Sequence, residues 1–399
     1  MAAASSPFVY LDHAATTPVR PEVAEAMDRA AAEAWANPSS PHAAGRRAKH
    51  VLEECREVIV SLLGGRTTGT GRDRLVFTSG ATEANRLAIL GLAAGATGVF
   101  ASSARDHTSV RNIRSDLAGR GWVVVETPLA GTGRSAPDWP FPPCGRGIWA
   151  TTFVCGQSGA VENLPRIAAG LRPRPEVLLH VDATQAVVTQ PIVMTDLGAA
   201  TLTLAPHKFA GPRGIGAVLV RGDVALEPLV PGPQEAGLRG GTEPVVLAVG
   251  FARALELAVA ERAAMAVRLA DLRDRFARAF TAQAVGRGLA VEAVVAAADA
   301  SPHILTLALT GVDRQAFVMA ADLAGVCCGT GTACASGSST PSPALISMGL
   351  TPGQVAAAVR FSFGQTTTES DVAAAVTRLA PVLDRLATHV RESCPKAVD

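Results

Sequence analysis

Two side chains near the middle of the chain combine residue types that cofactor chemistry uses. Asp182 ends an apolar run in the segment HVDATQ at residues 180–185, and Lys208 follows 26 residues later in APHK. An acid at the carboxyl end of a strand lies where open α/β sheets bind their ligands. A lysine among small and apolar residues loses solvation, which favours its neutral, nucleophilic form. An acid against a pyridinium nitrogen and a lysine on an aldehyde together describe pyridoxal phosphate.

A turn of small residues upstream has the pattern of a phosphate site. The segment TSGAT at residues 78–82 lies between a strand-like run and a helical stretch. Such a turn presents the free N–H groups of Gly80 and Ala81 and the positive end of the helix dipole, and the Thr82 hydroxyl adds a donor. The turn therefore predicts a phosphate ligand.

A cysteine in a loop is the third element that could carry chemistry. Cys334 stands within GTGTACASGSS at residues 329–339, where the apolar residues that enclose a core cysteine are missing. Loops carry much of protein function, and a thiol is strongly nucleophilic even when only a small fraction is ionised. Cys334 is therefore a candidate nucleophile.

Each of these residues also has an ordinary interpretation when it is taken alone. Asp182 is then more typical of a helix cap and Lys208 of a surface lysine, while Cys334 fits an exposed thiol equally well. A generic capped turn is at least as good an interpretation of residues 78–82. The acid, the lysine and the phosphate-type turn together favour a cofactor site.

Composition excludes several classes of protein. The chain has 399 residues, of which 48% are hydrophobic and 18% charged, so it is not a disordered chain. With 36 Lys and Arg against 35 Asp and Glu the net charge is +1, which leaves no excess of cations to neutralise a nucleic acid. We expect a small-molecule partner instead. No apolar stretch reaches the length of a membrane span.

The seven cysteines show no repeated spacing. Neither a disulfide framework nor a zinc site is therefore expected, and we predict no bound metal. The first residues lack a basic region followed by an apolar run, so we expect no signal peptide and a cytoplasmic protein.

Short β-type runs alternate with amphipathic helical stretches, which predicts an α/β fold with a mostly parallel sheet. We expect strands near residues 74–78, 98–101, 122–125, 148–154, 177–181, 202–204 and 217–220. The pattern becomes a long alanine-rich helix from about Val245 to Ala284. This predicts a large domain at 1–255, whose first 15 or so residues pack on the other unit, and a smaller C-terminal α/β domain at 256–399. The Pro- and Gly-rich stretch 127–147 is typical of a loop.

Many short motifs follow one another in an order that resembles the cysteine desulfurases of the class V aminotransferase family. They are VYLDHAATTP, NPSSPH, FTSGATEAN, DH, VDATQ, HKFAGPRGIGA, GLRGGTE, TACASGSS and VRFSFGQTTTE. The resemblance runs from about Val9 to Leu379, nearly the whole chain. The long Ser/Gly-rich cysteine loop is similar to the branch that serves iron–sulfur assembly. Selenocysteine lyases are close relatives that share most of these motifs.

The resemblance implies a role for each residue at the cofactor ring. Lys208 corresponds to the lysine that holds pyridoxal phosphate, and His107 to the histidine that stacks on the ring and assists proton transfer. Asp182 corresponds to the acid that keeps the pyridine nitrogen protonated. Gln185 corresponds to the residue that contacts the phenolic oxygen of the cofactor.

The resemblance also implies the phosphate, substrate and sulfur contacts. Thr82 and His207 match phosphate ligands beside Gly80 and Ala81, and Thr242 matches a threonine that reaches the phosphate across a dimer interface. Arg360 matches the arginine whose fork takes the substrate carboxylate, a bidentate contact that suits arginine. Cys334 matches the nucleophile that receives sulfur.

The implied protein is a fold-type I pyridoxal-phosphate-dependent transferase and a homodimer. It converts L-cysteine to L-alanine, carries sulfur as a persulfide on Cys334 and passes it to an acceptor or scaffold protein. One alternative keeps the cofactor and changes the reaction to that of a selenocysteine lyase or a β-eliminating lyase on a modified cysteine. Another is a weakly active paralogue that acts in sulfur relay.

Three departures from the family pattern motivate these alternatives. The family has two asparagines and a glutamate where this chain has Cys155, Gly156 and Gln157, and Gln157 is a candidate substitute amide. Ala205 replaces a serine that donates to the phosphate, and losing such a hydrogen bond costs about 1–3 kcal/mol when the acceptor stays unpaired. Gln365 stands where an arginine is common.

Overall fold

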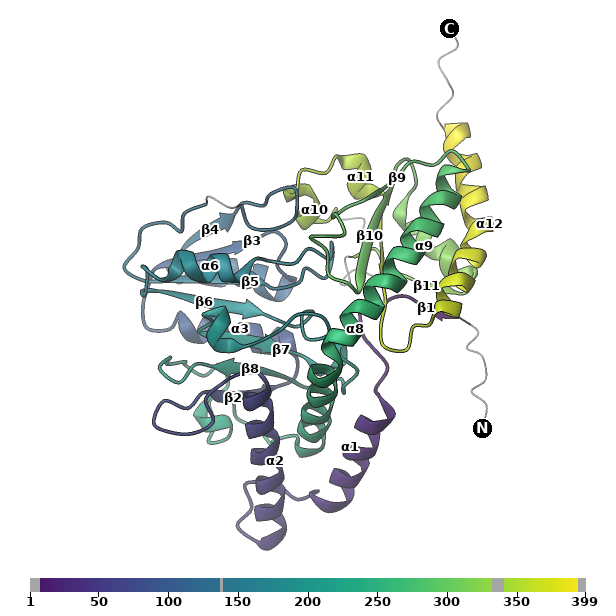
Figure 1. The fold of residues 1–399 in the computed structure, drawn as a ribbon. Helices are drawn as coiled ribbons and strands as arrows, with labels where there is room; N and C mark the ends of the chain where they lie inside the picture. Colours follow the sequence, from purple (N-terminus) through teal and green to yellow (C-terminus); the bar gives the residue numbers. More distant parts are fainter. Residues whose placement is uncertain (1–7, 137–138, 332–340, 394–399) are drawn as a thin grey trace.

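A seven-stranded sheet forms the centre of the larger unit (Figure 1). The computed structural model describes residues 8–136, 139–331 and 341–393, and within them the strand order is β2-β8-β7-β6-β5-β3-β4. The strands are β2 (Arg74–Thr78), β3 (Val99–Ser103), β4 (Val123–Thr127), β5 (Gly147–Thr152), β6 (Val177–Asp182), β7 (Thr201–Leu204) and β8 (Gly216–Val220). Neighbours from β7 to β4 pair in parallel, whereas β8 is antiparallel to both of its neighbours. The predicted α/β fold with a mostly parallel sheet is confirmed.

Helices cover both faces of this sheet because successive side chains of a strand point to opposite faces. On β2, Leu75 and Phe77 belong to one hydrophobic cluster, which includes residues of α1 (Pro21–Glu33) and α2 (Ala43–Leu62). Val76 belongs to the cluster on the other face, which includes most of the buried side of α3 (Ala81–Leu92). The remaining helices of this unit are short: α4 (Thr108–Arg111), α5 (Ile113–Gly119), α6 (Leu164–Leu171) and α7 (Met194–Leu197).

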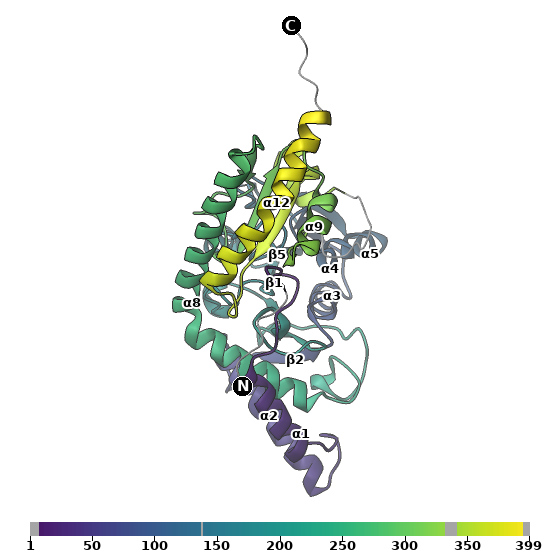
Figure 2. The same ribbon diagram turned by 90° about the vertical axis from the view of Figure 1, so that its right-hand side faces the viewer.

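One long helix, α8 (Val245–Val285), runs from the larger unit into the smaller (Figure 1). There it packs beside α12 (Glu369–Ser393), as Figure 2 shows. A three-stranded antiparallel sheet, β12-β10-β9, lies against these helices. The elements are β9 (Val291–Ala293), β10 (Ile304–Leu309), α9 (Arg314–Leu323), β11 (Val326–Cys327), α10 (Pro343–Ser347), α11 (Pro352–Ala356) and β12 (Ala358–Ser362).

The two hydrophobic cores meet along α8. Leu255 is the last residue of this helix in the core of the large sheet, and Leu269 is the first in the core of the smaller unit. Several phenylalanines pack together in that second core, with the Phe276 and Phe361 ring centroids 4.7 Å apart. A boundary drawn at residues 255/256 stays a prediction. It would divide a continuous helix.

The N-terminal segment joins the two units from the other side. Strand β1 (Val9–Tyr10) pairs in parallel with β11 of the smaller unit. A few residues later, Thr17 donates both its backbone N–H and its hydroxyl to the carbonyl of His207 in the larger unit. Residues 8–17 therefore cross from one unit to the other beside the predicted lysine.

The segment 127–147 behaves as the loop that its composition predicts. Between the end of β4 and the start of β5, its described residues form one isolated bridge, which joins Leu129 and Ser135. In the described part of the chain, none of the helices has both the length and the apolar character that a bilayer crossing requires.

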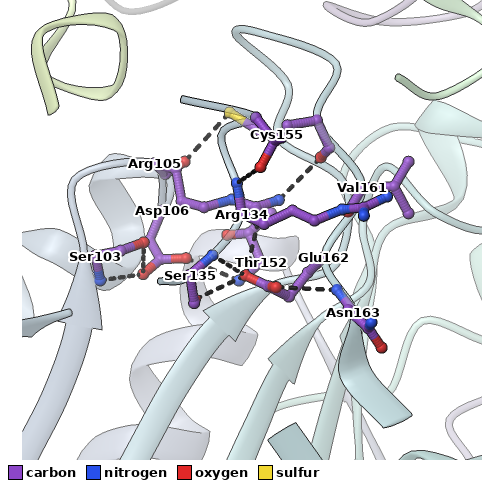
Figure 3. Close-up of polar contacts among 12 residues, drawn as sticks. Ser103, Arg105, Asp106, Arg134, Ser135, Thr152, Cys155, Val161, Glu162 and Asn163 are labelled. Atoms are coloured by element: carbon purple, nitrogen blue, oxygen red, sulfur yellow. Dashed lines mark hydrogen bonds and ion pairs between the residues drawn. The ribbon is translucent and has the colours of Figure 1, made fainter. Parts of the chain in front are cut away.

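A buried ion pair fastens this loop and the turn after β3 to the chain that follows β5 (Figure 3). The Arg105 and Glu162 side chains are fully buried, and Arg105 Nη1 lies 2.8 Å from Glu162 Oε2. Glu162 also accepts hydrogen bonds from the Ser135 hydroxyl at 2.7 Å and from the Ser135 and Asn163 backbone N–H groups. Burial would raise the pKa of Glu162, but the Arg105 charge and these hydrogen bonds lower it below its usual value.

We expect Glu162→Gln to lower the free energy of unfolding by about 3–5 kcal/mol at pH 7, because it leaves the Arg105 charge buried without its partner. The lowered pKa means that the Glu162 contribution is present above the carboxyl's unfolded pKa and is lost as the pH falls through the folded pKa. The difference between wild type and variant should therefore shrink in acid. Urea unfolding at pH 7 and at successively lower pH measures it.

Glu33→Gln is the matched control, because Glu33 and Arg47 form an ion pair whose side chains are 60% and 59% exposed. Exposed pairs contribute at most about 1 kcal/mol. Equal losses in the two variants would contradict a special role for the buried pair.

Candidate active site

A cavity of about 610 Å³ lies between the sheet of the larger unit and the smaller unit. Ligand sites of cofactor size range over roughly 300–1,000 Å³. Nine of the predicted site residues line this cavity: Gly80, Ala81, Thr82, His107, Asp182, Gln185, His207, Lys208 and Arg360. The structure thus brings together the lysine, the acid and the phosphate-type turn that the sequence singled out.

The topology explains this convergence. Asp182 is the last residue of β6, Lys208 closes a short 3-10 turn after β7, and Gly80 comes two residues after the end of β2. These strands run in the same direction, so their carboxyl ends meet at one edge of the sheet. Strand β8 runs the other way and starts there at Gly216, where an added Cβ would lie 2.5 Å from the carbonyl carbon of Gly80. Glycine at 216 therefore lets the turn approach the sheet closely.

The N-terminal segment forms the wall beside the lysine. Lys208 Nζ donates to the carbonyls of Ala14 at 2.8 Å and Ala15 at 2.6 Å. The Gln185 amide donates to the same Ala14 carbonyl at 2.7 Å. These contacts orient the amine and the amide toward one region of the cavity.

His207 lies next to this wall, with Nδ1 3.2 Å from the Thr16 hydroxyl. Burial and the positive charges of Lys208 and Arg213 lower the pKa of His207 to about 4. The imidazole is therefore neutral near pH 7 and can hydrogen-bond a phosphate without adding a charge to it.

Asp182 is nearly buried, with 3% of its surface exposed. Its Oδ2 accepts from the Asn85 amide at 2.9 Å, and its Oδ1 accepts from the Thr184 backbone N–H at 3.0 Å. Both donors are neutral. A buried carboxylate is costly unless a cation faces it, and a pyridinium N–H at the cavity would be such a cation.

His107 is held in place by its neighbour in the chain. The Asp106 carboxylate accepts from the backbone N–H groups of Ser103 and Thr152, both at 2.7 Å, which ties the turn after β3 to the end of β5 (Figure 3). Withdrawal from water lowers the pKa of His107, and Lys208 adds to this effect while Asp182 opposes it.

These residues fit pyridoxal phosphate. Gly80 caps α3 without a side chain, so the N–H groups at the start of this helix and the Thr82 hydroxyl stand ready for a phosphate. Lys208 offers an amine for the aldehyde and Asp182 an acceptor for the ring nitrogen. In the described residues, no three His, Cys, Asp or Glu side chains gather in the manner of a metal site.

Arg360 reaches the cavity from β12 of the smaller unit, and its side chain is 4% exposed. Its Nη1 donates to the Gly156 carbonyl and its Nη2 pairs with Asp12 Oδ1, both at 2.7 Å. The backbone of Arg360 exchanges hydrogen bonds with Gly329, where the cysteine loop begins. The guanidinium is thus held in one orientation at the cavity wall.

The departures at residues 155–157 lie at this wall. Gly156 and Gln157 line the cavity, and a Cβ at position 156 would lie 3.3 Å from Gln185 Nε2. The Ser342 hydroxyl donates to Gln157 Oε1, which fixes the side-chain amide of Gln157. Its function as a substitute amide stays a prediction.

The other two departures involve one lost donor and one replaced cation. Ala205 is fully buried and has no hydroxyl to offer. At Gln365, the backbone carbonyl accepts from Arg268 Nη2 at 2.8 Å, and Arg268 also donates to the carbonyl of Thr367. An arginine from α8 therefore supports the loop that lacks one of its own.

Two predicted residues are not placed in the cavity. Thr242 is exposed on the surface of the single chain and does not line the cavity. Cys334 lies outside the described residues, although Gly331 and Pro341, which flank its loop, both line the cavity.

Several lining residues were not predicted from the sequence. Arg105 and Arg111 line the cavity, although the Arg105 charge is paired with Glu162, and Thr152 and Thr184 line it at the ends of β5 and β6. Asn85 lies behind Asp182. A signal for Asn85 was present in the motif FTSGATEAN, because a polar residue among apolar ones on a helix calls for a buried partner.

Comparison with known proteins agrees with this geometry. The family model of the class V aminotransferases matches residues 9–374. The chain is 31% identical to the cysteine desulfurase IscS of Dictyoglomus turgidum, over 95% of each chain. It is also 31% identical to human selenocysteine lyase, over 91% of this chain and 89% of that one.

A solved structure of a NifS-like protein superimposes with a TM-score of 0.84 at 24% identity, covering 95% of this chain and all of the other. At that identity the likeness establishes the fold. The family match over most of the chain and the two full-length relatives go further. The chain belongs to the class V aminotransferases, as a pyridoxal-phosphate-dependent enzyme of the cysteine desulfurase and selenocysteine lyase group.

Proposed function

We propose that this protein is a cysteine desulfurase that converts L-cysteine to L-alanine and carries the sulfur on Cys334. The observation that supports this most is the convergence of Lys208, Asp182 and Arg360 on one cavity whose wall includes both flanks of the Cys334 loop. The amine, the acid and the guanidinium suit a cofactor-bound amino acid, and the thiol suits transfer of its sulfur.

The residues of the chain have separable tasks in this reaction. Pyridoxal phosphate, when bound, supplies an electron sink for negative charge that develops on the α-carbon of the substrate. Arg360 binds and orients the substrate carboxylate, and Lys208 moves a proton at the α-carbon. Gln185 and His207 orient the cofactor through its phenolic oxygen and its phosphate.

Sulfur transfer forms one bond and breaks another. The Cys334 thiolate attacks the substrate sulfur and an S–S bond forms. The bond between this sulfur and the β-carbon of the substrate breaks, with its electron pair left on the β-carbon. Protonation of that carbon gives alanine, so that cysteine and a thiol become alanine and a persulfide. The persulfide then passes to an acceptor or scaffold protein, in keeping with iron–sulfur assembly.

A homodimer completes the proposed site. Thr242 is exposed in the single chain and away from the cavity, which suits a residue that reaches the phosphate of a partner subunit. The cytoplasmic location also remains a proposal.

A selenocysteine lyase is the second candidate. The human selenocysteine lyase is as similar in sequence as the IscS relative, and the departures from the family pattern at Gly156 and Gln157 lie at the cavity wall. A lyase acting on another cysteine derivative and a weakly active sulfur-relay paralogue are the remaining alternatives.

Replacing the nucleophile tests the first proposal. We expect Cys334→Ala to lower sulfide release from L-cysteine in the presence of a reductant by at least about 100-fold, because the attacking thiol is lost. The visible absorbance of the bound cofactor should not change. Cys327→Ala, which alters a cysteine of β11, should retain wild-type activity. Sulfide production by Cys334→Ala at the wild-type rate would refute the assigned nucleophile.

Substrate choice separates the two candidates. We expect the wild-type enzyme to form alanine and a trapped persulfide from L-cysteine in a single turnover, because Cys334 then accepts the sulfur. The measurement is kcat/KM for alanine formation from L-cysteine and from L-selenocysteine under the same anaerobic conditions. Turnover of selenocysteine alone would replace the desulfurase with the lyase, and a cofactor spectrum that L-cysteine leaves unchanged would favour the relay paralogue.

A further inference from the structure

A single buried amide connects the two residues that face the predicted cofactor ring. Asn85, on α3, is fully buried, and its Nδ2 lies 2.9 Å from Asp182 Oδ2 and 2.8 Å from the Ser109 hydroxyl. The Ser109 hydroxyl in turn lies 2.9 Å from His107 Nδ1. Asp182 and His107 are therefore the two ends of one hydrogen-bonded chain that passes through Asn85.

Chemistry fixes the orientation of this amide. A carboxylate oxygen accepts hydrogen bonds, so the group of Asn85 that faces Asp182 must be the NH₂. The Asn85 carbonyl oxygen then faces His180 Nε2 at 3.0 Å, and His180 must donate from that nitrogen. Burial lowers the pKa of His180 to about 4, so the ring is neutral and its Nδ1 accepts from the Thr201 hydroxyl at 2.9 Å. His180 and Thr201 thus hold the amide in the orientation that Asp182 requires.

The same direction of donation reaches His107. The second N–H of Asn85 donates to the Ser109 oxygen, which leaves the hydroxyl hydrogen of Ser109 for His107 Nδ1. The backbone N–H of Ser109 also donates to Nδ1, at 3.2 Å. Because two donors point at Nδ1, the neutral ring of His107 carries its proton on Nε2.

We propose that Asn85 is a positioning residue that orients the Asp182 carboxylate and, through Ser109, fixes His107 as the tautomer protonated on Nε2. This inference rests on the proposed function only in taking the cavity as the cofactor site. His107 then presents a hydrogen-bond donor to the cavity. A proton added to this ring would have to displace both Ser109 donors from Nδ1, so His107 starts the reaction neutral.

Ring nitrogen spectra of the full-length, cofactor-loaded protein test the proposal without any substrate. The protein is labelled with ¹⁵N in its eight histidines, and the His107 signals are those lost in His107→Gln. We expect the two-bond ¹⁵N–¹H pattern of a neutral ring with its proton on Nε2 at pH 7.5. A proton on Nδ1 in the wild-type protein would overturn the proposal.

Two variants separate the two branches of this hydrogen-bonded chain, one toward Asp182 and one toward His107. Ser109→Ala removes the hydroxyl donor to His107 and keeps the contact between Asn85 and Asp182. It should lower the ratio of the Nε2 to the Nδ1 tautomer by about 3- to 10-fold, the effect of one hydrogen bond, with the cofactor absorbance unchanged. Asn85→Ala should change both the tautomer ratio and the absorbance maximum of the bound cofactor.

Thr151→Val is the matched control, because Thr151 is a buried residue on β5 that does not line the cavity and whose hydroxyl has no partner in the described residues. It should leave both readouts at their wild-type values. Asn85→Ala with both wild-type readouts would refute the role of Asn85. If that variant does not fold, the wild-type spectrum and Ser109→Ala still decide. If the wild-type protein shows the Nε2 tautomer of His107 but releases no sulfide from L-cysteine, the result would instead refute the proposed function alone.

Discussion

The rest of the site depends on one buried carboxylate, that of Asp182. It ends β6 with 3% of its surface exposed, and its donors, the Asn85 amide and the Thr184 N–H, are neutral. Such a group is stable when a cation faces it from the cavity, and the ring of pyridoxal phosphate supplies that cation. The sheet places Lys208 at the same edge because β7 runs parallel to β6. One electrostatic requirement and one topological rule therefore locate the cofactor.

The positions of the strands and of the site residues that follow them were predictable from the sequence. Apolar runs mark the buried parallel strands, and the motifs with Gly80, Asp182 and Lys208 come shortly after three of these runs. The runs at 74–78, 177–181 and 202–204 correspond closely to β2, β6 and β7. The antiparallel direction of β8 was not predicted, because apolar runs carry no direction. Buried polar pairs such as Arg105 and Glu162 were also missed, since partners 57 positions apart leave no periodic signal. Cys334 was found from its loop composition, and its place in the fold lies outside the described residues.

The departures from the family pattern become intelligible as a local change in packing. A side chain at position 156 would meet the Gln185 amide at 3.3 Å, so glycine there leaves that amide free to donate to Ala14. The Gly156 carbonyl meanwhile accepts from Arg360, a contact that any residue can make through its backbone. The stretch therefore still orients the arginine, and the polar side chain that it presents at the wall is that of Gln157. Position 156 thus lies between Gln185, which is assigned to the cofactor, and Arg360, which is assigned to the substrate carboxylate.

The N-terminal segment couples the substrate and cofactor ends of the cavity. Asp12 holds Arg360, and two or three residues later the carbonyls of Ala14 and Ala15 hold the Lys208 amine. Residues so close in the chain cannot move independently, because the backbone between them has only a few soft dihedral angles. Asp12 therefore ties the position of Arg360 to the short stretch of backbone whose carbonyls hold Lys208. The pairing of β1 with β11 anchors the segment in the smaller unit. The backbone that contacts Lys208 is therefore attached to that unit as well.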